Sequence, residues 1–260
     1  MKGLPYRTAW LKGSEVCPDI RTDSLHAYRF VLLGAPGVGK GTQAELLFER
    51  FGICPLSTGE IFRAARTDSD PRERTSAMSR ALRHMASGEL VPDEIVLSLV
   101  KERRKCLRCS GGFLLDGFPR TVAQAEALDE MLKADEMNLD AVLDYELPLE
   151  TIVARLGGRR TCSNCKKVFH VESLPPKRAG ICDSCGTVLI QRDDDRPEAV
   201  RVRMEAYQRS TLPLTEFYRR KGILVAIQCG DTPDETFERT LDQLKRVLPN
   251  RRPVLPNSPG

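Results

Sequence analysis

Residues 30–42 have the sequence FVLLGAPGVGKGT. The apolar run 30–33 predicts a short strand buried on both faces, and the apolar residues of 44–51 recur at the spacing of an amphipathic helix. A strand, a glycine-rich turn and a helix in this order are the setting of a phosphate-binding loop, where backbone N–H groups, the helix N-terminus and Lys40 surround one anion. Gly41 stands where the general motif has Ser or Thr, with Thr42 one place later, which argues against direct ligation of Mg²⁺ by a hydroxyl.

Composition narrows the class of protein. A chain of 260 residues, with 41% hydrophobic and 29% charged residues, is typical of one main globular domain with an inserted or appended subdomain. The net charge of +4 is too small to favour a nucleic-acid binder. No stretch approaches the roughly 18 apolar residues of a membrane-spanning helix. The nine cysteines are an odd number in a chain without a secretion signal, so metal binding is favoured over a disulfide framework.

Further apolar runs at 113–115, 141–143 and 223–227 alternate with helical patterns, as in a parallel α/β sheet. Helix starts are indicated by capping boxes at 57–60 and 121–124 and by Thr232 followed by Pro233. The charge run 103–105 is typical of a solvated helix face. Residues 1–28 are expected to be a flexible or loosely attached extension, whose three acidic residues argue against a transit peptide, and 249–260 a disordered, proline-rich tail.

Two C-x2-C pairs, Cys162/Cys165 and Cys182/Cys185, are separated by 16 residues, within the range of a four-thiolate zinc site. Such a closed site is structural, and it replaces a hydrophobic core where apolar residues are sparse. Free thiols, disulfides and iron remain as alternatives, and His170 is a spare candidate ligand. A third pair, Cys106/Cys109, has no partner pair and is expected to be without a redox or metal function.

Three segments together resemble the adenylate kinase family, in its bacterial-type long form with a four-cysteine zinc-binding lid: GAPGVGKGTQ at 34–43, STGEIFR at 57–63 and GFLLDGFPRT at 112–121. The resemblance spans about residues 29–245. It implies a P-loop nucleoside monophosphate kinase fold, with a parallel five-stranded sheet flanked by helices. The kinase domain is expected at 29–248, with a small helical AMP-binding insertion at 57–91 and a zinc-bearing lid at 158–195.

The resemblance also implies site residues. Those expected in catalysis are Lys40, Asp116, Arg120, Arg159, Arg192 and Arg203. Those expected to bind ATP are Gly37, Val38, Gly39, Lys40, Gly41, Thr42, Arg155, Arg159, Val168 and Phe169. Those expected to bind AMP are Thr58, Arg63, the backbone of Glu89, Leu90 and Val91, Gly117, Phe118, Pro119, Arg120, Gln124, Arg192 and Arg203, with Thr58 and Gln124 facing adenine. Arginine suits these positions because its planar fork pairs two phosphate oxygens, and Asp116 can hold the water shell of Mg²⁺.

The function expected from this resemblance is reversible, Mg²⁺-dependent transfer of a phosphoryl group from ATP to AMP, giving two ADP, in adenine nucleotide homeostasis. The enzyme is expected to be a cytoplasmic monomer without nucleic-acid or membrane partners, with Zn²⁺ in its lid. One alternative is a kinase for another nucleoside monophosphate, such as UMP or CMP. A second is a non-catalytic zinc-ribbon module that binds nucleic acid, which leaves the phosphate loop and Asp116 unexplained. A third is a degraded, nucleotide-sensing relative.

Overall fold

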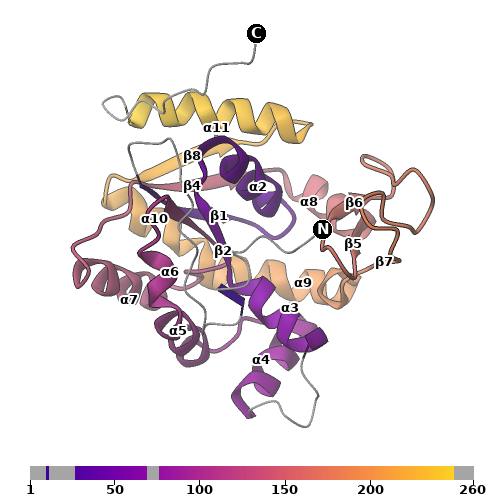
Figure 1. The fold of residues 1–260 in the computed structure, drawn as a ribbon, viewed down its shortest axis with the longest axis horizontal. Helices are drawn as coiled ribbons and strands as arrows, with labels where there is room; N and C mark the ends of the chain where they lie inside the picture. The colour runs from indigo at the N-terminus through magenta and orange to yellow at the C-terminus, as the bar shows by residue number, and fades with distance from the viewer. Residues whose placement is uncertain (1–9, 12–26, 69–75, 249–260) are drawn as a thin grey trace.

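The computed structural model describes residues 10–11, 27–68 and 76–248 (Figure 1). Its centre is a parallel sheet whose strands lie in the order β2 (Cys54–Ser57), β3 (Gly112–Asp116), β1 (Tyr28–Gly34), β4 (Ala141–Glu146) and β8 (Leu224–Gln228). The apolar runs of the sequence correctly predicted β1, β3, β4 and β8. The edge strand β2 was not among those runs, because Pro55 and Ser57 interrupt it, and an edge position tolerates proline.

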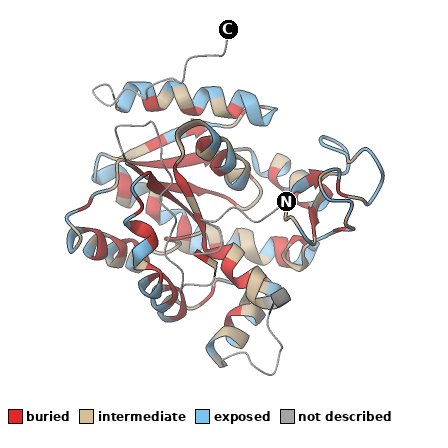
Figure 2. Cartoon of the chain, in the orientation of Figure 1, coloured by how far each residue is buried: buried red, intermediate tan, exposed pale blue. Residues whose placement is uncertain are grey.

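Helices cover both faces of the sheet. Val31 and Leu33 of β1 contribute to one hydrophobic core, while Phe30 and Leu32 contribute to the other, because successive strand residues point to opposite faces. The second core includes residues of α2 (Lys40–Phe51), α8 (Leu149–Gly158), α9 (Pro197–Ala206) and α11 (Pro233–Val247). The first includes residues of α5 (Asp93–Glu102), α6 (Arg104–Leu107), α7 (Val122–Lys133) and α10 (Pro213–Arg220). Figure 2 shows the buried residues concentrated in the sheet and on the helix faces turned toward it.

The helix starts indicated by local chemistry are present at two sites. The Thr121 hydroxyl accepts from the Gln124 backbone N–H at 3.2 Å, and the Thr232 hydroxyl accepts from that of Glu235 at 3.2 Å. The third start differs. Helix α3 does begin at Thr58, but the Ser57 hydroxyl donates to the Asp116 carboxylate at 3.3 Å. This contact joins the β2–α3 junction to the end of β3.

Two smaller units are attached to the sheet domain. The first contains α3 (Thr58–Asp68) and α4 (Ser76–Ser87), and α4 contacts α9. The second is a three-stranded antiparallel sheet in the order β6 (Val168–His170), β5 (Arg159–Cys162) and β7 (Leu189–Ile190), drawn at the right of Figure 1. A 3₁₀ turn (Asp193–Asp195) leads from it into α9, and a π-helical turn (Tyr207–Thr211) joins α9 to α10.

Part of the N-terminal extension lies in the core. Trp10 is 1% exposed and belongs to the first hydrophobic cluster, and Leu11 packs against the same cluster. Residues 1–9 and 12–26 of the extension, and the tail 249–260, lie outside the described residues. None of the helices described is both long and apolar enough to span a bilayer.

Candidate active site

The glycine-rich loop connects β1 to α2 and bends where the glycines are. Gly34, Gly37 and Gly39 have φ of 126°, 90° and 102°, backbone conformations that side chains disfavour. The Lys40 ammonium donates to the carbonyls of Gly34 at 2.7 Å and Ala35 at 2.9 Å. Burial lowers the Lys40 pKa to about 8, partly opposed by the nearby Asp116 carboxylate. The loop therefore holds a desolvated cation for which phosphate oxygens would be strong partners.

Two carboxylates lie at the same edge of the sheet. Asp116 ends β3 in register with Leu32, and Asp144 of β4 is in register with Leu33, so both are next to the loop. Asp144 is 3% exposed, and its Oδ1 has no hydrogen-bond partner among the described residues. Burial, with Glu146 nearby, raises the pKa of Asp144 to about 6 against the opposing influence of Lys40. Sequence reasoning missed Asp144, because a single acid after an apolar run carries no motif.

A second pocket lies beside the β2–α3 junction. The Gly117 carbonyl accepts from the Thr58 hydroxyl and from Arg120 Nε, each at 2.9 Å. The Gln124 side chain accepts from the Arg120 backbone N–H at 2.8 Å and donates to Asp93 at 2.6 Å. The remaining cavity of about 30 Å³ is lined by residues that include Thr58, Phe62, Leu90, Val91, Gly117 and Gln124.

The other residues expected around this pocket are placed differently. Phe118 is fully buried in the core, and the Phe118–Pro119 peptide bond is cis. The Glu89 carboxylate pairs with His84 Nδ1 at 2.7 Å, on the exposed side of α4. Thr58, Leu90, Val91 and Gln124 thus line one cavity, whereas the Phe118 side chain is in the core. The expectation for Glu89 concerns its backbone, and the pairing of its side chain with His84 does not test it.

Arginines gather between the loop and the pocket. Burial lowers the pKa of Arg120, Arg192 and Arg203, and each is lowered further by neighbouring arginines. These neighbours include Arg63 beside Arg120 and Arg192, and Arg159 beside Arg192 and Arg203. An anion binds more strongly where several partly buried cations lie together, because it relieves their mutual repulsion.

Two aspartates that sequence reasoning did not single out as ligands partly neutralise this cluster. Asp195 is fully buried and binds Arg159 through both oxygens, with Nε at 2.7 Å, and it also lies 3.1 Å from Arg203. The Asp194 carboxylate lies 3.1 Å from the same Arg203 nitrogen. Arg192 donates instead to the Thr161 hydroxyl of β5 at 2.9 Å. The arginines are therefore tied to the lid and to its return into α9.

Arg155, Val168 and Phe169 complete the set expected for ATP. Arg155 extends from α8 to donate to the Gly230 carbonyl at 3.2 Å. Val168 is 37% exposed, but Phe169 is 3% exposed and packs with Cys162 and Cys182. The Phe169 side chain is thus part of the lid core, so its main chain remains the part available to a nucleotide.

The four lid cysteines converge. Their sulfurs all lie within 4.8 Å of one another, with Cys162 to Cys185 at 3.4 Å and Cys165 to Cys182 at 3.5 Å. Sulfurs around a tetrahedral zinc, with bonds of about 2.3 Å, lie about 3.8 Å apart, so this thiol set fits such an ion. The four cysteines thus form a group that can bind a metal. His170 is not part of it, because its Nδ1 accepts from the backbone N–H groups of Glu172 and Ser173.

The remaining cysteines do not form a second group of this kind among the described residues. Cys54 and Cys109 have their sulfurs 3.4 Å apart inside the core, and Cys106 is buried nearby. Burial raises the pKa of the Cys106 thiol, which leaves less of the reactive thiolate.

The interpretation of 103–105 as a solvated face is wrong for Arg103. Its side chain is 9% exposed and donates to the carbonyls of Trp10 at 2.7 Å and Leu11 at 3.2 Å. The N-terminal segment supplies the acceptors that allow a guanidinium to be buried there. Arg104 agrees better with a solvated helix face, because its side chain is partly exposed and pairs with Asp135.

A glycine-rich loop follows the first strand of a five-stranded parallel sheet, and a pocket with Arg120 in its wall and a separate lid lie beside it. These features are those of a P-loop kinase of the nucleoside monophosphate class. Comparison with known proteins gives the family. The adenylate kinase family model matches residues 32–223, and the chain belongs to this family.

Three similar proteins, each named adenylate kinase, show how much of the chain is shared. That of Streptomyces avermitilis is 48% identical over 219 residues, which are 84% of this chain and 97% of the relative. That of Caldicellulosiruptor saccharolyticus is 50% identical over 211 residues, or 81% of this chain and 96% of the relative. That of Archaeoglobus fulgidus is 50% identical over 194 residues, or 75% and 87%.

Proposed function

We propose that this chain is an adenylate kinase, which transfers the γ-phosphoryl group of ATP reversibly to AMP and gives two ADP. The observation that carries the proposal is a partly buried group of cations, Lys40, Arg120, Arg192 and Arg203, that lies by the glycine-rich loop and the pocket of Thr58 and Gln124 in a chain of this family. Two nucleotides that meet end to end bring several negative phosphate charges together, and this group of cations can neutralise them.

ATP would lie with its phosphates in the loop of residues 37–42, within reach of Lys40 and Arg159. Its base would lie near Arg155, whose guanidinium is held beside Gly230. Val168 and the main chain of Phe169 would close over it from the lid. This assignment places the γ-phosphate beside the arginine cluster.

AMP would occupy the pocket of Thr58, Leu90, Val91 and Gln124. Arg63, Arg120, Arg192 and Arg203 would bind its phosphate, with residues 117–120 forming the wall toward ATP. The present cavity of about 30 Å³ has room for about one water molecule. Admitting a purine therefore requires the pocket to widen, through its side chains or through the insertion 57–91, which we propose is a movable part.

The reaction needs no protein base. The second pKa of a phosphate monoester is near ~6, so the AMP phosphate is already mostly a dianion at neutral pH. What remains for the protein is in-line alignment and stabilisation of the charge spread over the transferring group. Lys40 supplies a cation on the loop side, and Arg120 and Arg203 supply cations on the acceptor side.

The two metals have separate roles in this proposal. Mg²⁺, when bound with ATP, neutralises phosphate charge, and Asp116 at the end of β3 would hold its water shell, oriented by the Ser57 hydroxyl. Zn²⁺ would be held by Cys162, Cys165, Cys182 and Cys185 as a structural ion, far better suited to thiolates than Mg²⁺. The lid 158–195 then has a metal in place of a core.

We place the kinase domain at 29–248 and infer a cytoplasmic monomer without nucleic-acid partners. Four thiols gathered for one metal suit a reducing compartment. A nearby alternative is a kinase of UMP or CMP. Thr58 and Gln124 at the proposed adenine pocket favour AMP.

The test is a coupled assay of the purified protein with ATP, Mg²⁺ and AMP, beside UMP, CMP, GMP and a control without acceptor. We expect rapid ADP formation with AMP alone. A preference for another nucleoside monophosphate would show that this nucleotide, and not AMP, is the acceptor. Inactivity of folded, metal-loaded protein would overturn the proposal.

A further inference from the structure

Trp10 contacts the root of the insertion. Its indole Nε1 donates to the backbone carbonyl of Ser57 at 2.9 Å, across 47 residues of chain. Ser57 is the last residue of β2, and the next residue, Thr58, begins α3. The side chains of Ser57 and Thr58 bind Asp116 and Gly117 respectively. One hydrogen bond from Trp10 therefore acts on the peptide that joins two elements of the proposed site.

The same segment is bound at the other end of the insertion. Arg103 follows α5, the helix that starts directly after the insertion 57–91. Arg103 donates through Nε to the Trp10 carbonyl at 2.7 Å, through a terminal nitrogen to the Leu11 carbonyl at 3.2 Å, and through the other to the Leu99 carbonyl of α5 at 3.2 Å. Trp10 and Arg103 together therefore connect the β2–α3 junction to α5.

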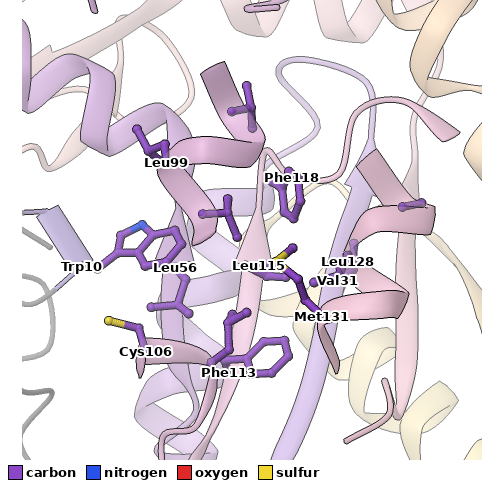
Figure 3. Packing of buried hydrophobic residues seen from close by; sticks show 14 of the residues in the cluster. Trp10, Val31, Leu56, Leu99, Cys106, Phe113, Leu115, Phe118, Leu128 and Met131 are labelled. Carbon is purple, nitrogen blue, oxygen red and sulfur yellow. The ribbon is translucent and has the colours of Figure 1, made fainter. Parts of the chain in front are cut away.

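Hydrophobic packing of the Trp10 indole adds to these hydrogen bonds. Figure 3 shows the indole of Trp10 among Leu56, Leu99 and Cys106, residues of β2, α5 and α6. A buried indole stabilises both by the apolar area it covers and by its one N–H donor, which needs an acceptor. Removing the ring would open a cavity and leave the buried Arg103 guanidinium next to it.

Trp10 is also outside the part of the chain that the family model covers, which begins at residue 32. The three relatives described above are matched over 87–97% of their own length by 75–84% of this chain. Trp10 thus lies outside the residues that the family model matches.

We propose that Trp10 is a positioning residue for the acceptor nucleotide, acting through the Ser57 carbonyl and Arg103 to hold both ends of the AMP-binding insertion. This inference rests on the proposed AMP site. Any movement of the insertion must turn on its two ends, and Trp10 fixes those ends relative to β3 through Ser57 and Arg103. It touches no substrate, so its effect falls on AMP binding and leaves ATP binding largely unchanged.

The test compares the full-length Trp10→Phe and Trp10→Ala variants with Leu214→Ala, a control in the same hydrophobic cluster but on α10. We expect Trp10→Ala to raise the KM for AMP about 5–10-fold with the KM for ATP within about twofold. Trp10→Phe, which keeps a ring but loses the N–H, should give a smaller rise of about 2–3-fold. Leu214→Ala should lower the Tm without changing the ratio of the two KM values.

Equal changes in both KM values, or the same ratio in Trp10→Ala and Leu214→Ala, would reduce Trp10 to a structural role and overturn the proposal. If Trp10→Ala does not fold, the KM for AMP of Trp10→Phe is compared with that of the wild type instead. Trp10 is the chain's single tryptophan, so AMP should change its fluorescence saturably while ATP alone should not. Absence of that change together with an unaltered KM for AMP in Trp10→Phe would overturn the proposal.

A separate variant distinguishes failure of the positioning role of Trp10 from failure of the proposed AMP site. Gln124→Ala should raise the KM for AMP if the acceptor pocket is assigned correctly. A normal KM for AMP in Gln124→Ala contradicts the proposed site, whereas a raised value beside unaffected Trp10 variants contradicts only the positioning role.

Discussion

At the scale of single residues, the site consists of charges that protein groups satisfy only partly. The Lys40 ammonium has two carbonyls as partners, and burial lowers its pKa. Arg159 and Arg203 have aspartates as partners at the lid's return. Phosphate oxygens would be better partners for Lys40 than carbonyls are, because both members of the pair are then charged.

Lys40→Met should therefore lower kcat by about 10³-fold with little change in Tm, because it removes a charge that acts on the transferring phosphoryl group. Steady-state kinetics and thermal unfolding measure the two effects. Lys245→Met, at an exposed lysine of α11, is the matched control and should behave as wild type. Activity near that of wild type in Lys40→Met would contradict the role of the loop lysine.

Asp144 should make stability depend on pH. Burial raises its pKa to about 6, so between about pH 4 and 6 the folded state binds more protons than the unfolded state. The free energy of unfolding of the wild type therefore falls as pH rises through this window. Asp144→Asn lacks that fall and should be more stable by about 1–2 kcal/mol at pH 7.5.

Urea unfolding at pH 7.5 and 4.5 measures this difference. The advantage of Asp144→Asn should be clearly smaller at pH 4.5, where Asp144 is protonated in the folded wild type but still mostly ionised in the unfolded chain. An equal advantage at both pH values would show that the substitution acts through packing and not through charge.

At the scale of elements, the lid depends on its cysteines more than on its core. Its buried apolar cluster holds only Cys162, Phe169, Cys182 and Leu189, with Cys165 packed beside it. The short strands β5, β6 and β7 cannot order 38 residues by hydrogen bonding alone when several lid hydrophobics, such as Leu174 and Val188, are exposed. A bound metal supplies what this core lacks.

Removal of the metal should therefore unfold the lid before the sheet domain. We expect about one zinc per chain by elemental analysis, and a fall in Tm of at least about 5 °C after chelation or in Cys162→Ser. Cys229→Ser, outside the lid, is the control and should retain the metal. Iron in place of zinc would correct the metal's identity, and full stability of metal-free protein would contradict its structural role.

At the scale of the whole molecule, the insertion and the lid meet on one side of the sheet. Helix α4 contacts α9 and the 3₁₀ turn at the lid's return, and Arg203 of α9 binds Asp194 and Asp195 of that turn. The insertion and the lid thus share α9 as a common support. In the proposed reaction, closing one unit would bring the arginines of the other toward the same phosphates.

Water should for this reason be excluded only when both nucleotides are bound. ATP hydrolysis without AMP should be at least about 10³-fold slower than phosphoryl transfer to AMP, because the open site lacks the alignment and desolvation of the closed one. Phosphate release from ATP and Mg²⁺ alone measures this rate. A hydrolysis rate within tenfold of the transfer rate would contradict closure by both units.

The sequence by itself determined the features that depend on short spacings. The phosphate loop at 34–42, the cysteine pairs of the lid and four of the five strands were predicted because each is specified by neighbouring residues. The family resemblance indicated which arginines belong to the site, and Arg120, Arg192 and Arg203 do lie in one partly buried group. Their individual roles toward ATP and AMP stay predictions.

Only the tertiary structure decided the contacts between distant segments. Trp10 meets Ser57 across 47 residues and Arg103 meets Trp10 across 93, so a charge run that suggested a solvated face contains a buried cation. Asp144 is buried because β4 lies between β1 and β8 in the sheet, a position that the sequence around Asp144 does not indicate. The physical reason is that burial and hydrogen-bond partners come from packing between elements, and local sequence patterns contain no record of which elements will meet.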